Sequence, residues 1–153
     1  MIPENLLDNP VVAALKDLAT SAKLEFDELT VEIAPGSIVE ALRRVKKDLQ
    51  FERLTSVTGV DRYPAEPRFE IVYHLQAIAK KQRLRLKARV ASDPCEIESA
   101  TSVYRSANWY ERETFDLFGV RFAGHPDLTR IVMPDDWEGH PLRKDYPVTG
   151  TRY

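Results

Sequence analysis

Hydrophobic and polar residues alternate along two neighbouring segments in the middle of the chain. In residues 69–75 apolar side chains recur at every second position, and in residues 83–90 aliphatic side chains alternate with basic ones. The basic positions of the second segment form a stripe: Arg83, Arg85, Lys87 and Arg89. A period of two is typical of a strand that buries one face. Because only a short turn separates the segments, the pattern predicts an antiparallel hairpin.

Two helical patterns precede this hairpin. Asn9 and Pro10 suit the N-cap and the first helical position, and the apolar spacing that follows predicts an amphipathic helix from Pro10 to about Ser21. A second amphipathic pattern runs from Ile38 to Leu49. We therefore expect two helices in the N-terminal half of the chain.

The start of the second helix carries two local signals. Ser37 and Glu40 stand at the spacing of a capping box, in which each side chain bonds to the backbone amide of the other residue. Glu40 also precedes Arg44 by four residues, a spacing that predicts an ion pair on one face of the helix.

Shorter segments complete the predicted order of elements. Strands are predicted for Leu29–Ile33 and Leu54–Val60, a helical turn or two for Ser99–Arg105, and a helix for Trp109–Phe118 that is capped by Asn108 and ended by Gly119. Prolines at 126, 134, 141 and 147 exclude long regular elements beyond this helix. The order predicts an α+β fold: two helices of the N-terminal half pack on a mixed, mainly antiparallel sheet, followed by a helix and an extended irregular C-terminal strap.

The length and composition agree with one domain. The chain has 153 residues, of which 43% are hydrophobic and 30% charged. We expect residues 1–118 to form the α+β domain and residues 119–153, called the strap below, to be a partner-docking segment of the same domain. The formal net charge of −2 gives no overall field that would recruit nucleic acid.

Neither a membrane helix nor a secretion signal is predicted. No apolar run approaches the roughly 20 residues that a membrane helix needs. The N-terminus lacks a basic region followed by an apolar one, which argues against a signal peptide. The single cysteine, Cys95, excludes an internal disulfide or an all-cysteine cluster within the chain. A cytoplasmic protein fits these features best.

The acidic and histidine residues allow two chemical interpretations. His125 and His140, with carboxylates between them, allow a metal site, but neither histidine has a partner at metal-ligand spacing, so a turn or polar contact is favoured. Glu111, Glu113 and Asp116 allow a hydrolytic centre, since Glu113 and Asp116 can share a helical face. We favour a structural role instead, in which Arg112 and Asp116 pair at i,i+4 and the glutamates complement the helix dipole.

The remaining candidates point away from redox or nucleotide chemistry. Cys95 is interpreted as a packing residue in preference to a reactive thiol. The chain has no glycine-rich phosphate loop, so no nicotinamide, flavin or nucleotide site is predicted. The basic stripe lacks interleaved exposed aromatic residues, so a solvated or protein-facing surface is favoured over nucleic-acid binding.

The segment from Trp109 to Pro147 is the most informative part of the chain. Of its 39 residues, 13 are charged, and prolines bracket the Arg143–Lys144–Asp145 triplet. A dense polar segment suits a protein interface, where charges set register and specificity. Three blocks of this segment resemble the signature of the thirty-kilodalton subunit family of respiratory complex I: ERE..D.FG from Glu111, GHP.L.R from Gly124 and G.PLRKD.P from Gly139.

This resemblance implies a non-redox structural subunit of the hydrophilic arm of proton-translocating NADH–quinone oxidoreductase. FMN and iron–sulfur clusters would lie in partner subunits. The chain would dock chiefly beside the D subunit, which helps bind quinone, and near the B subunit, which holds the last cluster. The resemblance implies a peripheral location on the cytoplasmic side of the bacterial inner membrane, with membrane association only through the complex. No catalytic, cofactor-binding or metal-binding residue and no activity of the isolated chain are expected.

Two other functions remain open at this point. One is the equivalent subunit or module of a related membrane-bound hydrogenase. The other, more remote, is a freestanding hydrolase or metal-dependent enzyme built on Glu113, Asp116 and His125. Interface residues are predicted within the signature: Glu111, Arg112, Glu113, Asp116, His125, Arg130, Arg143, Lys144 and Asp145.

Overall fold

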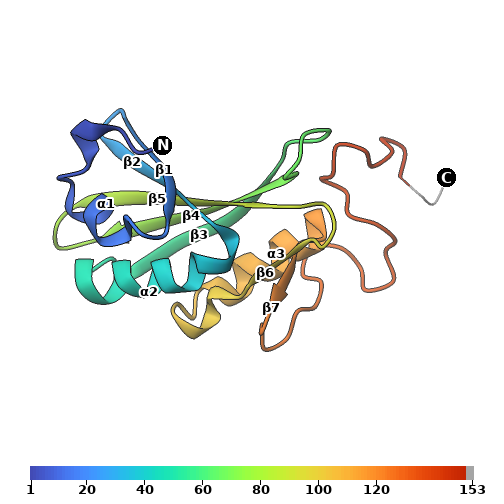
Figure 1. The fold of residues 1–153 in the computed structure, drawn as a ribbon. Helices are drawn as coiled ribbons and strands as arrows, with labels where there is room; N and C mark the ends of the chain where they lie inside the picture. Colours follow the sequence, from blue (N-terminus) through green and yellow to red (C-terminus); the bar gives the residue numbers. More distant parts are fainter. Residues whose placement is uncertain (151–153) are drawn as a thin grey trace.

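A five-stranded sheet with helices on one face forms the body of the computed structural model, which describes residues 1–150 (Figure 1). The elements are, in chain order, η1 (Glu4–Leu6), α1 (Pro10–Leu15), β1 (Ala19–Glu25), β2 (Glu28–Ile33), η2 (Pro35–Ser37), α2 (Ile38–Leu49), β3 (Arg53–Asp61), β4 (Phe69–Ala77), β5 (Gln82–Val90), β6 (Glu96–Glu98), η3 (Ala100–Ser102), α3 (Ala107–Phe118) and β7 (Arg121–Ala123). The predicted α+β class is confirmed.

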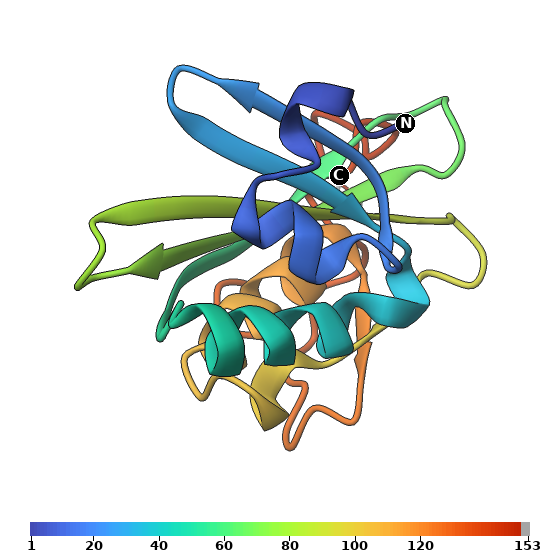
Figure 2. The same cartoon turned by 60° about the vertical axis from the view of Figure 1, so that its left-hand side comes forward.

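The sheet is mixed and mainly antiparallel. Its strand order is β1-β2-β5-β4-β3, and β2 and β5 are the parallel pair within it. The predicted hairpin is confirmed as β4 and β5, with Phe69 opposite Val90 and Leu75 opposite Leu84. In the turned view of Figure 2, α2 and α3 again lie below the sheet, so both views place these helices on the same face.

The hydrophobic core lies between this sheet face and the helices. The apolar positions of β4 and β5 that alternate in the sequence are buried, among them Ile71, Leu86 and Ala88. On the other face the basic stripe makes cross-strand ion pairs, Arg85 with Glu28 and Lys87 with Glu70, each at 3.0 Å. Period-two alternation therefore separated the two faces correctly.

The first helix is shorter than predicted. It ends at Leu15, and Ala19–Glu25 forms β1, which pairs antiparallel with β2. Phe26 and Asp27 both adopt positive φ in the connecting turn, as two-residue hairpin turns favour. The hydrogen bonds to β2 stabilise this segment as a strand, although the spacing of its apolar residues also fits a helix. The spacing within one segment could not reveal a partner strand that comes later in the chain.

The capping box of the second helix is wrong, whereas its ion pair is confirmed. The Ser37 amide donates to the Ala34 carbonyl at 2.9 Å, beside the short helix η2. Glu40 instead accepts hydrogen bonds from Arg43 at 3.1 Å and from Arg44 at 3.0 Å. The Ser37 amide, which would bond to the Glu40 side chain in a capping box, therefore already donates a hydrogen bond within the preceding turn.

Helix α3 covers the outer edge of the sheet. The hydroxyl groups of Ser106 and Thr114 donate to the carbonyls of Leu54 and Val57 in β3, at 3.1 and 3.2 Å. Helix α3 begins at Ala107, earlier than the predicted cap at Asn108. These side chains occupy backbone acceptors that an open edge strand would present to another chain.

The strap is irregular over most of its described length, with one exception. Residues Arg121–Ala123 form β7, which pairs parallel with β6, and neither strand was predicted from the sequence. Each of these strands has only three residues, too few for an alternation of apolar and polar positions to be recognised. The last positions of the predicted strap, 151–153, lie outside the described residues. No helix within residues 1–150 is long and apolar enough to cross a membrane.

Candidate partner-docking site

The strap is bound to the end of the sheet through Arg68, which lies directly before β4. Arg68 donates to both carboxylate oxygens of Asp61, each at 2.9 Å, and to both oxygens of Asp145, at 2.6 and 3.2 Å. The Lys144 amide adds a bond of 2.8 Å to Asp61. The Arg68 guanidinium holds the pKa of the Asp61 carboxyl well below its usual range. Charge-assisted pairs therefore fix this part of the strap.

Aromatic rings surround these cations. The Arg68 guanidinium lies 4.7 Å from the ring centre of Tyr63 and 4.9 Å from that of Phe69. Arg143 lies 5.3 Å from the same Phe69 ring, and its Nε donates to the Phe118 carbonyl at 2.6 Å. Two residues of the predicted interface triplet, Arg143 and Asp145, thus contact their own chain.

A second anchor of the strap is the buried Asp116 of α3. One of its oxygens accepts from three successive amides, those of Ile131, Val132 and Met133, at 3.1, 2.7 and 2.9 Å. The other accepts from Arg130 at 2.8 Å. Burial opposes ionisation, but the three amides and Arg130 outweigh it and lower the pKa of Asp116.

The predicted i,i+4 pair between Arg112 and Asp116 is wrong. Arg112 donates to the carbonyls of Thr129 and Arg130, at 3.1 and 3.2 Å, and its guanidinium lies 4.8 Å from the ring centre of Trp109. Both side chains therefore bind the strap and not each other. Spacing along the helix could not reveal this, because the strap supplies stronger partners for each of them.

The glycines of the signature allow the strap to approach closely. At Gly119, which ends α3 with a φ of 77°, an added Cβ would lie 2.6 Å from both a His140 carbon and an Arg143 nitrogen. His140 Nδ1 also lies 2.9 Å from the Asp116 carbonyl. At Gly139, with a φ of 85°, an added Cβ would lie 2.7 Å from the Tyr146 ring. Glycine is needed at both positions for conformation and space.

Glu111 holds the segment after β6 against α3 from a fully buried position. Its oxygens accept from the Ala100 amide at 2.6 Å and from the Ser99 hydroxyl at 2.7 Å. Burial raises the pKa of this carboxyl to about 7, although both bonds favour the charged form. The expected role at the helix dipole is wrong for Glu111, whereas Glu113 is exposed on the same helix.

His125 completes the buried polar group. Its Nδ1 accepts from the Asp127 amide at 3.0 Å, so the proton lies on Nε2, which faces the Asn108 carbonyl at 3.0 Å. Nε2 lies 4.0 Å from a Glu111 oxygen. This agrees with the interpretation of His125 as a turn and contact residue.

The described residues contain no group of three or more His, Cys, Asp or Glu side chains placed to hold a metal ion. Nor do the three residues of the remote hydrolase interpretation form a site, because Asp116 binds strap amides, His125 binds backbone groups and Glu113 is exposed. Cys95 is partly buried against the core, and burial raises the pKa of its thiol. It therefore matches the predicted packing role.

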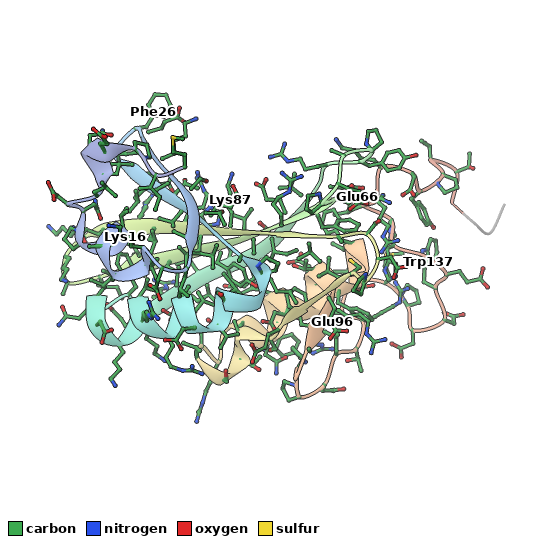
Figure 3. The ribbon with its side chains drawn as sticks, in the orientation of Figure 1. Lys16, Phe26, Glu66, Lys87, Glu96 and Trp137 are labelled. Atoms are coloured by element: carbon green, nitrogen blue, oxygen red, sulfur yellow. The ribbon has the colours of Figure 1, made fainter. Side chains whose placement is uncertain are left out.

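The outward surface of the strap and of α3 is apolar at several points. Trp109 is 60% exposed, Val132 57% and Leu142 52%, and Ile131, next to Val132 in the chain, is 38% exposed. Figure 3 shows Trp137, also on the strap, at the end of the molecule away from Lys16 and Phe26. The sequence interpretation assigns docking to the charged residues and does not include these apolar ones. The sequence signal for them was the presence of apolar side chains between prolines, in a stretch without the periodicity of core residues.

These features define a class of protein: a two-layer α+β domain whose C-terminal segment is bound to α3 and to the end of its own sheet and presents apolar side chains outward. The family model described as "Respiratory-chain NADH dehydrogenase, 30 Kd subunit" matches residues 31–152. The chain belongs to this family.

Curated relatives agree with this assignment. The NADH-quinone oxidoreductase C subunit of Citrifermentans bemidjiense is 46% identical over 147 residues, covering 94% of this chain and 91% of the relative. The corresponding C subunit of Geobacter sulfurreducens is 47% identical over 148 residues with the same coverage.

Two solved structures share the fold. A trypsin-resistant fragment of Nqo5 has a TM-score of 0.68 and 28% identity, covering 82% of this chain and 98% of that chain. A chain of the membrane-bound sulfane sulfur reductase, an archaeal respiratory membrane complex, has a TM-score of 0.76 and 28% identity, covering 90% of this chain and 84% of that chain.

Proposed function

We propose that this chain is a non-redox structural subunit of the hydrophilic arm of a proton-translocating NADH–quinone oxidoreductase, docked through the outer surface of its strap. The observation that carries the proposal is the opposite orientation of two kinds of side chain. Arg143, Asp145 and Asp116 bind their own chain, whereas Val132 and Leu142 are about half exposed.

The internal bonds give the docking surface a fixed shape before a partner arrives. Asp116 holds three successive amides of the strap, and Arg68 holds Asp145. A segment ordered in advance loses less conformational freedom on binding, which favours affinity. The apolar side chains then supply buried contact area, and the exposed charges of Lys144 and Glu113 form part of a polar rim.

Family membership supports a proposal for the partner subunits and the location. Electron carriers, namely FMN and iron–sulfur clusters, would lie in partner subunits, since this chain has one cysteine and no glycine-rich phosphate loop. We infer that the strap contacts the D subunit, which contributes to the quinone site, with the B subunit nearby. The chain would lie on the cytoplasmic side of the bacterial inner membrane and reach the membrane only through the complex.

Charge introduced into the apolar strap surface tests this proposal. Leu142→Asp should lower the amount of chain recovered with the membrane complex, and NADH–quinone activity should fall in proportion to assembled complex. The matched control is Leu7→Asp, at a leucine that is also partly exposed but lies in the N-terminal region. Both variants should unfold thermally like the native chain. Normal recovery of the Leu142 variant in the complex would contradict docking through this surface.

A second candidate is the equivalent subunit of a related membrane-bound respiratory complex, such as a hydrogenase. It is favoured by the likeness to a chain of the sulfane sulfur reductase complex. Mass spectrometry of the complex purified from native membranes separates the two candidates. Recovery of a flavin-containing NADH-oxidising subunit supports the first, and a hydrogenase or sulfur-reducing subunit without it supports the second.

A further inference from the structure

A groove lies at the end of the molecule opposite the strap. It has a volume of about 560 Å³ and is bounded by the β1–β2 turn, the β4–β5 turn and the C-terminal end of α2. Val11, Leu29 and Phe51 contribute apolar side chains that are at least nine-tenths buried. Leu24 and Leu49 also line it. We call this feature the tip groove.

The β1–β2 turn places a solvent-exposed aromatic ring beside the tip groove. Phe26 is 101% exposed, and Figure 3 shows it projecting from the turn, far from Trp137 of the strap. Its φ of 51° belongs to the left-handed region, which bulky residues rarely adopt. Glycine or asparagine would suit this turn position better. The folding of the hairpin therefore does not account for a phenylalanine here.

Two apolar side chains of the tip groove, Leu24 and Phe26, are too exposed for a small ligand to cover. Small-molecule pockets enclose most of the ligand surface within a concave site. Here Leu24 is 48% exposed and Phe26 fully exposed although both line the groove, so a small ligand held within it would leave much of their surface in water. Covering them requires a surface of the size that another protein provides, and exposed aromatic residues often mark such contacts.

The charged residues around the tip groove indicate which charge a partner segment should carry. Lys80, Lys81 and Arg83 line the side formed by the β4–β5 turn. On the side formed by the β1–β2 turn the carboxylates are Asp27 and Glu28, and Glu28 is already paired with Arg85 at 3.0 Å. Positive charge therefore predominates at the rim, which complements an acidic partner.

We propose that the tip groove is a second docking surface, which receives a segment of a neighbouring subunit carrying an apolar side chain flanked by aspartate or glutamate. The apolar side chain fills the groove against Phe51 and under Phe26. The flanking carboxylates face Lys80 and Lys81. The inference rests on the proposed function for the existence of a neighbouring subunit, but it uses none of the strap contacts.

Photo-crosslinking in the assembled complex tests the occupant. Phe26 is replaced by benzoylphenylalanine in the full chain, the complex is purified from membranes and irradiated, and the crosslinked peptide is sequenced by mass spectrometry. The control places the same group at Leu7, an exposed leucine that does not line the tip groove. The expected product joins residue 26 to a peptide of another subunit that has an apolar residue beside at least two carboxylates.

Charge reversal tests the complementarity. Lys80→Glu combined with Lys81→Glu should reduce the crosslink from position 26 roughly tenfold, the equivalent of about 1.4 kcal/mol. The control combines Lys16→Glu with Lys47→Glu, at two exposed lysines that lie outside the tip groove. It should leave the crosslink unchanged. An equal reduction in both double variants would overturn the assignment of an acidic segment.

The two proposals fail in different ways. If the strap does not dock, the Leu142→Asp variant is incorporated normally, whatever happens at position 26. If the tip groove is unoccupied, the chain is incorporated, but position 26 crosslinks to other subunits no more than position 7 does. A crosslink only to a second copy of this chain, to lipid or to a small molecule would likewise overturn the tip-groove inference.

Discussion

Arg68 and Asp145 are 77 positions apart in the chain and are joined by hydrogen bonds of 2.6 and 3.2 Å. The same guanidinium binds Asp61, so one buried cation links the end of β3, the start of β4 and the strap. The Asp61 side chain is 2% exposed and the Asp145 side chain 44% exposed. The two carboxylates should therefore contribute very differently to stability.

Removing the cation should cost more than removing the exposed carboxylate. Arg68→Ala leaves Asp61 as a buried charge without its cation, and we expect a loss of about 3–5 kcal/mol in the free energy of unfolding. Asp145→Ala removes a half-exposed partner, for which a loss of about 0.2–1 kcal/mol is expected. Urea unfolding of both variants measures the difference. Similar losses in the two would show that Asp61 does not depend on Arg68.

Glu111 should make the protein less stable as the pH rises. Its pKa is raised from 4.5 to about 7 in the folded state, so the folded chain binds more protons than the unfolded chain between these values. The associated stability is complete below about pH 4.5 and is lost as the pH rises through about 7. A pKa change of this size corresponds to at most about 3 kcal/mol.

Glu111→Gln isolates this contribution because the amide does not ionise. Urea unfolding of the native chain and the variant at about pH 5 and about pH 8, on either side of the folded pKa, gives the comparison. We expect the native chain to lose more stability than the variant over this interval. The same pH dependence in both would exclude Glu111 as its source.

Asp116 should control the order of the strap. Asp116→Ala leaves the amides of residues 131–133 without their acceptor, and a loss of at least about 3 kcal/mol is expected because several charge-assisted bonds disappear. Asp116→Asn keeps one carbonyl acceptor and should lose less. Hydrogen exchange should accelerate at residues 131–133 in the Ala variant. Unchanged exchange at these residues would show that Asp116 does not order the strap.

Gly119→Ala should be destabilising by more than about 1 kcal/mol. Its φ of 77° disfavours alanine, and the added Cβ would meet His140 and Arg143 at 2.6 Å. Gly36→Ala is the control, since nothing in the described part of the chain lies within 4 Å of an added Cβ there. That change should be neutral or slightly stabilising. Thermal unfolding of both variants tests the distinction, and equal effects would contradict it.

Tyr73→Phe should leave stability unchanged or raise it by about 1 kcal/mol. The Tyr73 hydroxyl is buried and, among the residues that the structure describes, has no hydrogen-bond partner. Tyr104→Phe is the matched control, because its hydroxyl donates to the Phe51 carbonyl at 2.6 Å. The control should lose about 0.5–1.5 kcal/mol. A comparable loss at Tyr73 in chemical unfolding would reveal a bond to its hydroxyl.

Local patterns predicted the regular elements that are long enough to show a period. The β4–β5 hairpin and α2 lie where alternation and helical spacing placed them, and Gly119 ends α3 in the left-handed conformation. The start of β1 was predicted as helix because its apolar spacing fits both structures over a few residues. Its pairing with β2 decided between them.

The sequence by itself determined the α+β class, the two faces of the hairpin and, through the signature from Trp109 to Pro147, the family. These depend on periodicity, turn residues and motif spacing, which are properties of neighbouring positions. Only the tertiary structure decided that Asp116 binds Arg130 instead of Arg112, and that Asp145 binds Arg68. A charged side chain takes the partner that burial and geometry bring to it. Folding of the strap onto α3 and β4 supplies those partners from distant positions, and leaves Val132 and Leu142 facing outward.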